Sequence, residues 1–361
     1  MFGHPELPKP DSKEAVTLCE LWDTSTARAK RYTAEHDYGV SYGGMSNWRL
    51  RCRRHNLPPT EIIKQDFSLH EHIERLLAVD ELTLPHTRMP GELTVDIATT
   101  LPIAVPHMAD MHQGEAGCDY RAIERDHNLV CTEPGVYNVL GGDAYSNIIM
   151  PGMIGSAHNQ APICVQKAMY YMEVEQQHDS GHMLFMGTGN HNYWSALATG
   201  EDWDIELARR INTVYTKHGA MVHIVVGEMV YDEFWEHKGK YESSFNQTHG
   251  PKQSQRVYHP RARIVVREHK HVAAIEQYRY DDRECVAIRP GTYVTYSDFA
   301  ARNGMYGAHV CNPTVVLFPD RDWIVGFKFM EDAIIYLRSV RKDYEERGLG
   351  IAAEHVRPIA R

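Results

Sequence analysis

The chain has 361 residues, a formal net charge of −10 and 43% hydrophobic residues, so a sizeable buried core is expected. It contains neither an apolar run of roughly 20 residues nor the regions of a signal peptide, which predicts a cytoplasmic protein without a membrane partner. Its seven scattered cysteines include no C-x-x-C pair, which argues against a disulfide framework and against a thiolate zinc site.

The first 60 residues are predicted to form a basic, helical module. Residues 12–21 show apolar spacing near 3.6, and a second helix is expected after Thr24-Ser25-Thr26. A third helix is expected from Ser46 to about His55. Three short helices, the last rich in arginine, are typical of a helix-turn-helix module. Residues 24–56 carry seven basic and two acidic side chains, which makes DNA a candidate partner.

The arginines of this module are candidates for contacting DNA phosphates or base edges. They are Arg49, Arg51, Arg53 and Arg54. The glycine-rich turn before them is longer than the usual turn of about three or four residues, which weakens this interpretation. The alternative is a helical arm that mediates homo-oligomerisation, with the arginines on a solvated face.

The remaining sequence predicts a linker over residues 61–95, an α/β domain over 96–335, and a C-terminal helix and tail over 336–361. In the α/β region, short apolar runs alternate with helical stretches, as expected for strands buried between helical layers. The apolar runs include Leu101–Val105, Met183–Met186, Met221–Val226 and Arg263–Val266. The helical stretches include Ala161–Gln176, Asp204–Lys217 and Glu331–Glu346.

Five short polar segments follow one another through the α/β region, most of them directly after an apolar run. They are Asp110-Met111-His112, Gly142-Asp143, Gly189-Asn190-His191, Thr248-His249-Gly250 and His269-Lys270-His271. Loops that leave strand ends are where α/β folds gather functional groups. Carboxylate, amide and imidazole ligands without thiolate suit Mn²⁺, Zn²⁺ or Fe ions. Seven ligands exceed the need of one tetrahedral ion and suit two ions that share a bridging carboxylate.

The order of these segments resembles the calcineurin-like metallophosphoesterase family, whose pattern is D-x-H, G-D, G-N-H-[D/E], a single H and G-H-x-H. The resemblance covers about residues 96–330. It implies a four-layer α/β fold, with a β-sandwich flanked by helices, and hydrolysis of a phosphate ester by a metal-bound hydroxide. It also implies two divalent metal ions as cofactors, with Mn²⁺ favoured and Zn²⁺, Fe, Ni²⁺ or Mg²⁺ as alternatives.

The resemblance also implies a role for each polar residue. Asp110, His112 and His271 would hold the first metal, and Asp143 would bridge both metals. Asn190, His249 and His269 would hold the second metal. The catalytic residue would be His191, which protonates the leaving oxygen or steadies the transition state. The polar residue that the family commonly carries beyond G-D corresponds to Asn147.

Two positions depart from the family pattern. Asn192 stands where an acid would orient His191, and Glu268 replaces the glycine of G-H-x-H. The single histidine also has three candidates in range, which are His218, His223 and His249. His249 is preferred because residues 243–248 can form a strand that leads into it.

The favoured function is hydrolysis of a phosphodiester in nucleic acid or a nucleotide, and a nuclease that processes DNA ends is one form of it. The basic N-terminal module favours this substrate class. The alternative is a DNA-binding regulatory protein with a weak or inactive phosphoesterase body. Asn192 and Glu268 are the features that would favour the regulator.

Overall fold

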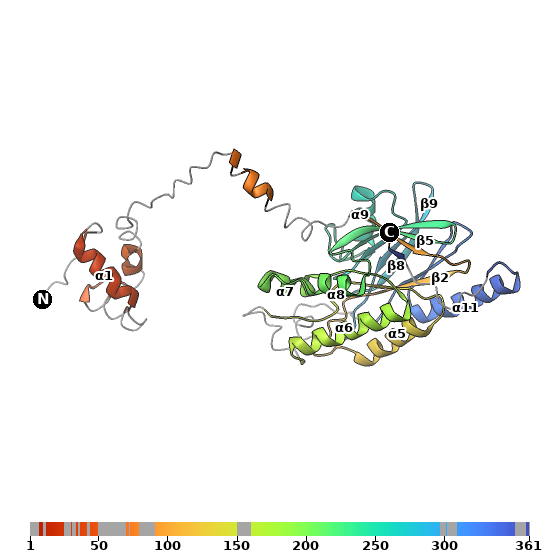
Figure 1. Ribbon diagram of the computed structural model, residues 1–361, viewed down its shortest axis with the longest axis horizontal. Helices are drawn as coiled ribbons and strands as arrows, with labels where there is room; N and C mark the ends of the chain where they lie inside the picture. Colours follow the sequence, from red (N-terminus) through yellow and green to blue (C-terminus); the bar gives the residue numbers. More distant parts are fainter. Residues whose placement is uncertain are drawn as a thin grey trace. The chain divides into compact units, whose positions relative to one another are not determined.

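The computed structural model divides the chain into a small unit, residues 1–87, and a large unit, residues 88–361 (Figure 1). The residues that the structure describes are 7–9, 12–24, 30, 34, 37–41, 44–49, 70–71, 73–78, 91–149, 160–296, 301, 309–350 and 359–360. Among these residues, no helix combines the length and the apolar character that a bilayer crossing needs.

The small unit has an apolar core of its own. Helix α1 (Lys13–Thr24) follows the predicted helical spacing and buries Ala15, Leu18 and Trp22. These side chains pack with Ala34, Met45 and Trp48. The indole N–H of Trp48 donates to the carbonyl of Pro8 at 2.9 Å. The side chains of Trp22 and Trp48 therefore form a large part of the core of the small unit.

The helix-turn-helix stays a prediction, because much of it lies outside the described residues. Residues 44–49 are helical, and Arg49 is half-buried at their end. The other three arginines proposed to contact DNA, Arg51, Arg53 and Arg54, fall outside the described residues.

The large unit is a mixed α/β structure built on two sheets. In spatial order, the seven-stranded sheet contains β12 (Ile359–Ala360), β1 (Glu92–Ile97), β5 (Gly219–Val226), β6 (Met229–Glu236), β7 (Ile264–Arg267), β9 (Arg283–Arg289) and β8 (Ala274–Tyr280). The five-stranded sheet contains β11 (Ile324–Phe327), β10 (Thr314–Leu317), β2 (Ile103–Met108), β3 (Asn138–Leu140) and β4 (Met183–Met186). The β2–β3 and β3–β4 pairs are parallel, so the carboxyl ends of these three strands meet at one edge.

The two sheets pack against each other through alternate side chains of their strands. Ile103 and Val315 of the five-stranded sheet belong to the same buried cluster as Val222, Trp235 and Ile264 of the seven-stranded sheet. All residues of β2 and β4 are buried, because the five-stranded sheet is covered on both faces. This double cover explains why these strands read as unbroken apolar runs in the sequence.

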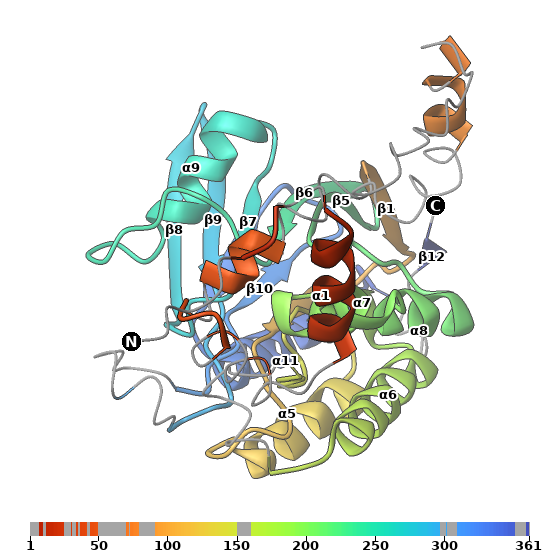
Figure 2. The same ribbon diagram turned by 90° about the vertical axis from the view of Figure 1, so that its left-hand side faces the viewer.

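Helices cover the outer faces of the two sheets (Figures 1 and 2). Helices α5 (Tyr120–Thr132), α6 (Ile163–Ser180), α8 (Trp203–Ile211) and α11 (Met330–Glu346) share a buried cluster with the five-stranded sheet. Helix α9 (His249–Tyr258) contacts β7 and β9 of the other sheet. Helix α7 (Asn190–Thr199) follows β4 and contacts α8. The ends of β2, β3, β4, β6 and β7 lie near one another, because residues that follow these strands are in contact.

Several elements differ from the sequence-based expectations. Residues 243–248 form a turn-rich loop and not the strand expected before His249. Strand β1 begins at Glu92, before the expected domain start at residue 96, and α11 runs across the expected boundary at residue 335. Strand β12 pairs with β1, so the end of the chain joins the large sheet. Helix α8 ends at Ile211, earlier than expected, because Asn212 caps it in a left-handed conformation.

Candidate metal centre

Four of the five polar segments follow the ends of strands, as their positions in the sequence predict. Asp110 and His112 follow β2, and Asp143 follows β3. Asn190 begins α7 after β4, and the segment that contains His269 follows β7. These loops meet at one edge of the sandwich and bring together residues that are more than 150 positions apart.

Left-handed backbone conformations are concentrated in these loops. The φ angles are +49° at Asp110, +48° at His112, +55° at Asp143, +74° at His269 and +60° at His271. With Asn147, these residues make six of the eleven non-glycine positions with positive φ in the described part of the chain. Such strained conformations cluster at functional sites, where the surrounding structure holds them in place.

A ladder of backbone hydrogen bonds holds these conformations. The N–H of Asp110 donates to the carbonyl of Gly142, and the N–H of His112 donates to the carbonyl of Asp143, both at 2.9 Å. The first two ligand loops therefore run side by side beyond the ends of β2 and β3.

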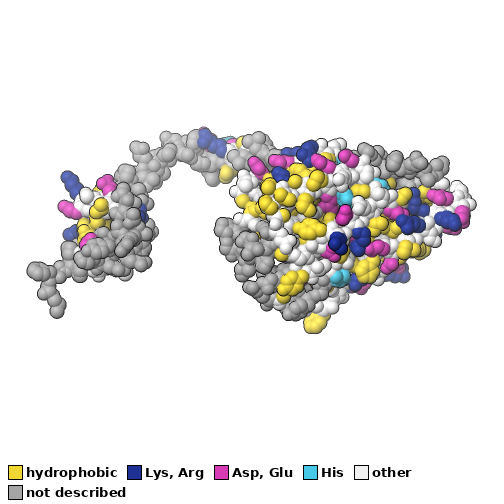
Figure 3. Space-filling view, turned by 90° about the horizontal axis from the view of Figure 1, so that it is seen from below, with side chains coloured by type: hydrophobic (Ala, Val, Ile, Leu, Met, Phe, Trp, Pro, Cys, Tyr) yellow, Lys and Arg dark blue, Asp and Glu magenta, His cyan; other side chains and the backbone are white. Residues whose placement is uncertain are grey.

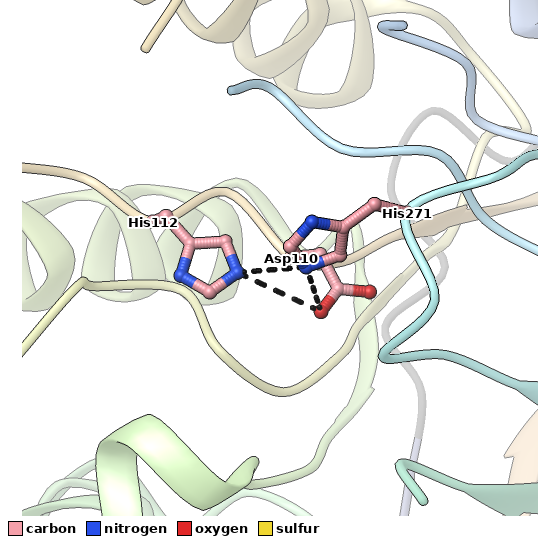
Figure 4. A group of neighbouring side chains, drawn as sticks. All are labelled: Asp110, His112 and His271. Carbon is pink, nitrogen blue, oxygen red and sulfur yellow. Dashed lines mark hydrogen bonds and ion pairs between the residues drawn. The ribbon is translucent and has the colours of Figure 1, made fainter. Parts of the chain in front are cut away.

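Asp110, His112 and His271 form the first group of potential ligands (Figure 4). Asp110 is fully buried, and its Oδ2 accepts the backbone N–H of His269 at 2.9 Å. Its Oδ1 lies 3.4 Å from Nε2 of His271 and 3.9 Å from Nε2 of His112. The two Nε2 atoms are 3.0 Å apart. The structure therefore brings together the three side chains that the resemblance assigns to the first metal.

The second group contains Asp143, His237 and His269. His237 lies directly after β6, and its Nε2 is 3.1 Å from Oδ2 of Asp143 and 3.2 Å from Oδ1 of Asn190. Asp143 also belongs to a third group with His112 and His191. Asp143 thus lies between the two ligand sets, at the position expected of a bridging carboxylate.

His237 takes the place that the sequence suggested for His249. His249 is the first residue of α9, and its N–H donates to the carbonyl of Asn246 at 3.1 Å. Among the described residues, His249 joins none of the three groups of potential ligands. The structure therefore brings His237, and not His249, together with Asp143 and His269. His218 and His223, which were also in range, are likewise outside these groups.

The signal for His237 is present in the sequence but weak. Strand β6 reads Met-Val-Tyr-Asp-Glu-Phe-Trp-Glu, so charged residues interrupt its apolar pattern. Glu233 is nevertheless fully buried, because Nε2 of His107 on the facing sheet lies 3.1 Å from its carboxylate. A strand that contains a buried histidine–carboxylate contact does not show clean alternation, so the sequence pattern does not mark the histidine at its end as a strand-end residue.

Burial lowers the pKa of two histidines in these groups, whereas in His237 and His271 the neighbouring carboxylates outweigh burial and raise the pKa. Burial lowers the pKa of His269 to about 4, and burial together with the charges of His191 and His271 lowers the pKa of His112 well below its usual value. Burial alone would raise the pKa of Asp143, but His237 and His191 hold it well below its usual range. Neutral imidazoles and ionised carboxylates are the forms that bind metal ions.

The site also contains buried polar atoms that lack hydrogen-bond partners. Within the described residues, these include Oδ1 of Asp110, Nδ1 of His112, Oδ2 of Asp143 and Nδ1 of His269. Buried polar groups normally have partners, and an ion is one explanation for exceptions. The oxygen and nitrogen donors fit Mn²⁺, Zn²⁺ or Fe ions. The residues that fit a two-ion centre are Asp110, His112, Asp143, Asn190, His237, His269 and His271.

His191 lies beside this centre and is held by several contacts. Its backbone N–H donates to Oδ1 of Asp143 at 2.7 Å, and its Nδ1 lies 2.6 Å from the carbonyl of Ser146. The ring centroid is 4.1 Å from that of Trp194 and 4.6 Å from that of His112. The Nδ1 contact leaves Nε2 as the ring nitrogen available for proton transfer.

The Asn192 departure from the family pattern has a structural explanation. Its amide donates to Oδ2 of Asp204 at 2.9 Å, within the buried part of α7 and α8. Asn147 donates to the carbonyl of His191 at 2.6 Å and so supports the turn that carries this histidine. The carbonyl of Ser146 therefore orients the His191 ring, and no acid at position 192 is needed for that purpose.

Two glycines of the motifs are required by packing. A Cβ atom at Gly142 would lie 2.6 Å from Nδ1 of His237 and 2.5 Å from the backbone nitrogen of Gly189. A Cβ atom at Gly189 would overlap the carboxylate of Asp143. The glycines of the G-D and G-N pairs thus let the loop after β4 approach the loop after β3 closely enough to contact Asp143.

A buried carboxylate behind the site gives a prediction about stability. Glu173 of α6 accepts a hydrogen bond from Gln113 at 2.5 Å, and burial raises its pKa to about 7. A raised folded-state pKa stabilises the fold below pH 4.5, and this contribution disappears as the pH rises to 7. The unfolding free energy of Glu173→Gln minus that of wild type should therefore increase by on the order of 2–3 kcal/mol when the pH is raised from 5 to 8. Urea unfolding at both pH values tests this, and an unchanged difference would contradict it.

No family model matches the chain, and no curated protein matches its sequence. Among solved structures, the chain is similar to Vps29 from Entamoeba histolytica, which was solved in complex with Zn²⁺. The identity is 9% and the TM-score 0.31, over 62% of this chain and 97% of that chain. Similarity at this level defines neither family nor activity, so a function has to be inferred from the geometry of the site itself.

Proposed function

We propose that the chain is a metal-dependent phosphoesterase of the calcineurin-like type, with a two-ion centre at the loop edge of the β-sandwich. The observation that carries the proposal is the meeting of two carboxylates, one amide oxygen and four imidazoles, several with buried atoms that lack hydrogen-bond partners. Two divalent ions bound there would lower the pKa of water and clamp the oxygens of a phosphate ester.

The side chains divide into two sets around Asp143. Asp110, His112 and His271 would hold one ion. Asn190, His237 and His269 would hold the other, and Asp143 would contact both. The backbone ladder between the first two loops keeps the carboxylates in place, which favours one fixed arrangement of the substrate phosphate.

His191 is the residue that we propose donates a proton to the leaving oxygen. Its Nδ1 is engaged by the carbonyl of Ser146, and its ring lies beside His112 at the edge of the ligand set. A general acid held in this way contributes typically 100- to 10,000-fold to the rate.

Replacing this acid should separate catalysis from metal binding. His191→Ala should lower kcat for an aryl phosphodiester by about 100-fold or more and leave the metal content at the wild-type value. His178→Ala, in the last turn of α6, is the matched control and should keep wild-type kcat. A His191→Ala protein with wild-type kcat would rule out this role.

For the substrate, we propose a phosphodiester of nucleic acid or a nucleotide. The support is the basic character of residues 24–56 in the small unit. On the face of the large unit shown in Figure 3, acidic and basic side chains are mixed. The second candidate function is a DNA-binding regulator with a weak phosphoesterase body.

Metal analysis and a substrate panel test these functions together. The full chain would be loaded with Mn²⁺, Zn²⁺, Fe²⁺, Ni²⁺ or Mg²⁺ and assayed with aryl monoesters, aryl diesters, cyclic nucleotides, DNA and RNA. Two bound ions and diester hydrolysis above background are expected. Bound ions with DNA binding but no hydrolysis would favour the regulator, and a chain that binds none of these ions would reject the proposed centre.

A further inference from the structure

Glu268 is a buried carboxylate at the end of β7, directly before His269, with 1% of its surface exposed. Its Oε2 accepts the backbone N–H of Gly142 at 2.8 Å and lies 3.0 Å from Nδ1 of His237. Its Oε1 accepts the indole N–H of Trp235 at 2.8 Å. The carboxylate therefore joins β6, β7 and the loop after β3.

These contacts determine which nitrogen of His237 carries a proton in the metal-binding form. Oε2 of Glu268 accepts from Nδ1–H of the ring, so the lone pair of the neutral imidazole lies on Nε2. Nε2 faces Oδ2 of Asp143 and Oδ1 of Asn190, which are both acceptors. In the metal-binding form, Nε2 and these two oxygens are three acceptor atoms that face one another, and one cation could contact all three.

The surrounding backbone is shaped around this carboxylate. A Cβ atom at Gly141 would overlap Oε1 of Glu268, so a glycine is needed there. Burial of an ionised carboxylate is costly unless hydrogen bonds compensate it. The three donors around Glu268 supply that compensation.

A second buried histidine–carboxylate pair in the large unit shows the difference between a structural pair and this one. His107 and Glu233 connect the two sheets, with Nε2 of His107 3.1 Å from the carboxylate. Nδ1 of the same ring lies 3.2 Å from the carbonyl of Pro313, so both nitrogens are engaged in the core. In His237, by contrast, the carboxylate engages one nitrogen and the other faces the ligand set.

We propose that Glu268 is a positioning residue, which fixes the tautomer and the ring orientation of His237 and so increases the affinity of the ion held by Asn190, His237 and His269. The inference rests on the proposed two-ion centre. Carboxylates that hold a ligand histidine in this way increase its basicity, and their loss typically weakens metal binding by about 10- to 100-fold. At this position the chain carries a functional side chain where the family pattern has glycine.

The experiment is a titration of the metal-free full chain with Mn²⁺. Binding is measured by calorimetry and by the electron paramagnetic resonance signal of free Mn²⁺. Glu268→Gln should bind one Mn²⁺ about 10- to 100-fold more weakly than wild type and bind the other with nearly wild-type affinity. The amide keeps the size of the side chain and removes its charge. Glu233→Gln removes a buried carboxylate beside a histidine in the core, and should keep wild-type affinity for both ions.

A second variant keeps the test valid if Glu268→Gln does not fold. Glu268→Asp retains the charge but is too short to keep all three hydrogen bonds, so a smaller weakening confined to the same ion is expected. Wild-type affinity for both ions in folded Glu268→Gln would overturn this inference and leave the two-ion centre intact. If the wild-type chain binds no Mn²⁺, the calorimetric titration is repeated with Zn²⁺, Fe²⁺, Ni²⁺ and Mg²⁺, and a chain that binds none of these ions would overturn both.

Discussion

Asp143→Asn should lower kcat/KM for a phosphate ester by at least about 1,000-fold and reduce the bound divalent ions from two per chain to one or none. Asp143 belongs to two of the three groups of potential ligands. Its Oδ2 faces His237, and its Oδ1 accepts the backbone N–H of His191. The amide of asparagine removes the negative charge shared between the two ligand sets, so the loss should affect both ions. Elemental analysis after dialysis and steady-state kinetics measure the two effects.

Asp126→Asn is the matched control for this change. Asp126 is also a buried aspartate, but it accepts hydrogen bonds from Tyr293 and Asn312 and belongs to none of the groups of potential ligands in the described residues. It should cost stability and leave the metal content and kcat/KM close to wild type. If Asp143→Asn kept two ions and the wild-type rate, the bridging role would be wrong.

His237→Ala and His249→Ala should give opposite results. His237→Ala should remove one of the two ions and lower kcat/KM by about 100-fold or more, because its Nε2 faces Asp143 and Asn190. His249→Ala should retain both ions and the wild-type rate, because this residue begins α9 and lies in none of the ligand groups of the described residues. Metal content and kinetics of the two variants, compared side by side, test the revised ligand set.

Thermal unfolding of both variants in a chelator provides the control for folding. His237 is buried beside Glu268, so its loss is also expected to lower stability, whereas His249 is only half-buried. The reverse pattern, with metal loss only in His249→Ala, would restore the assignment made from the sequence.

Most residues of the proposed ligand set could be identified from the sequence because they follow strand ends. The buried strands β2, β4 and β7 are short apolar runs, and the polar residues after them lie in the loops at the site. The run that precedes His237 is different, since Asp232 and Glu233 interrupt it. Its strand character depends on the partner sheet, which supplies His107 to Glu233. A contact between two sheets leaves no pattern in the sequence around Glu233, so the strand could not be recognised from that sequence alone.

The two departures from the family pattern show the same limit. From the sequence, Asn192 and Glu268 suggest a weakened enzyme. In the structure, the carbonyl of Ser146 lies at the ring nitrogen of His191, and Glu268 lies at the ring nitrogen of His237. Backbone carbonyls carry no sequence signal, and the contact of Glu268 joins β6 to β7. The pairing of β12 with β1 was equally hidden, because a two-residue strand has no periodicity.

The left-handed backbone at five of the predicted ligands has a consequence for how the protein would acquire its ions. Asp, Asn and His are residue types that tolerate this conformation better than most, and they are also the residue types that bind hard and borderline cations. Asp, Asn and His at these positions therefore meet two requirements, the left-handed backbone of the loop and the binding of a cation. A coordination shell whose backbone already has its final shape can be loaded after synthesis is complete, with little rearrangement of the chain.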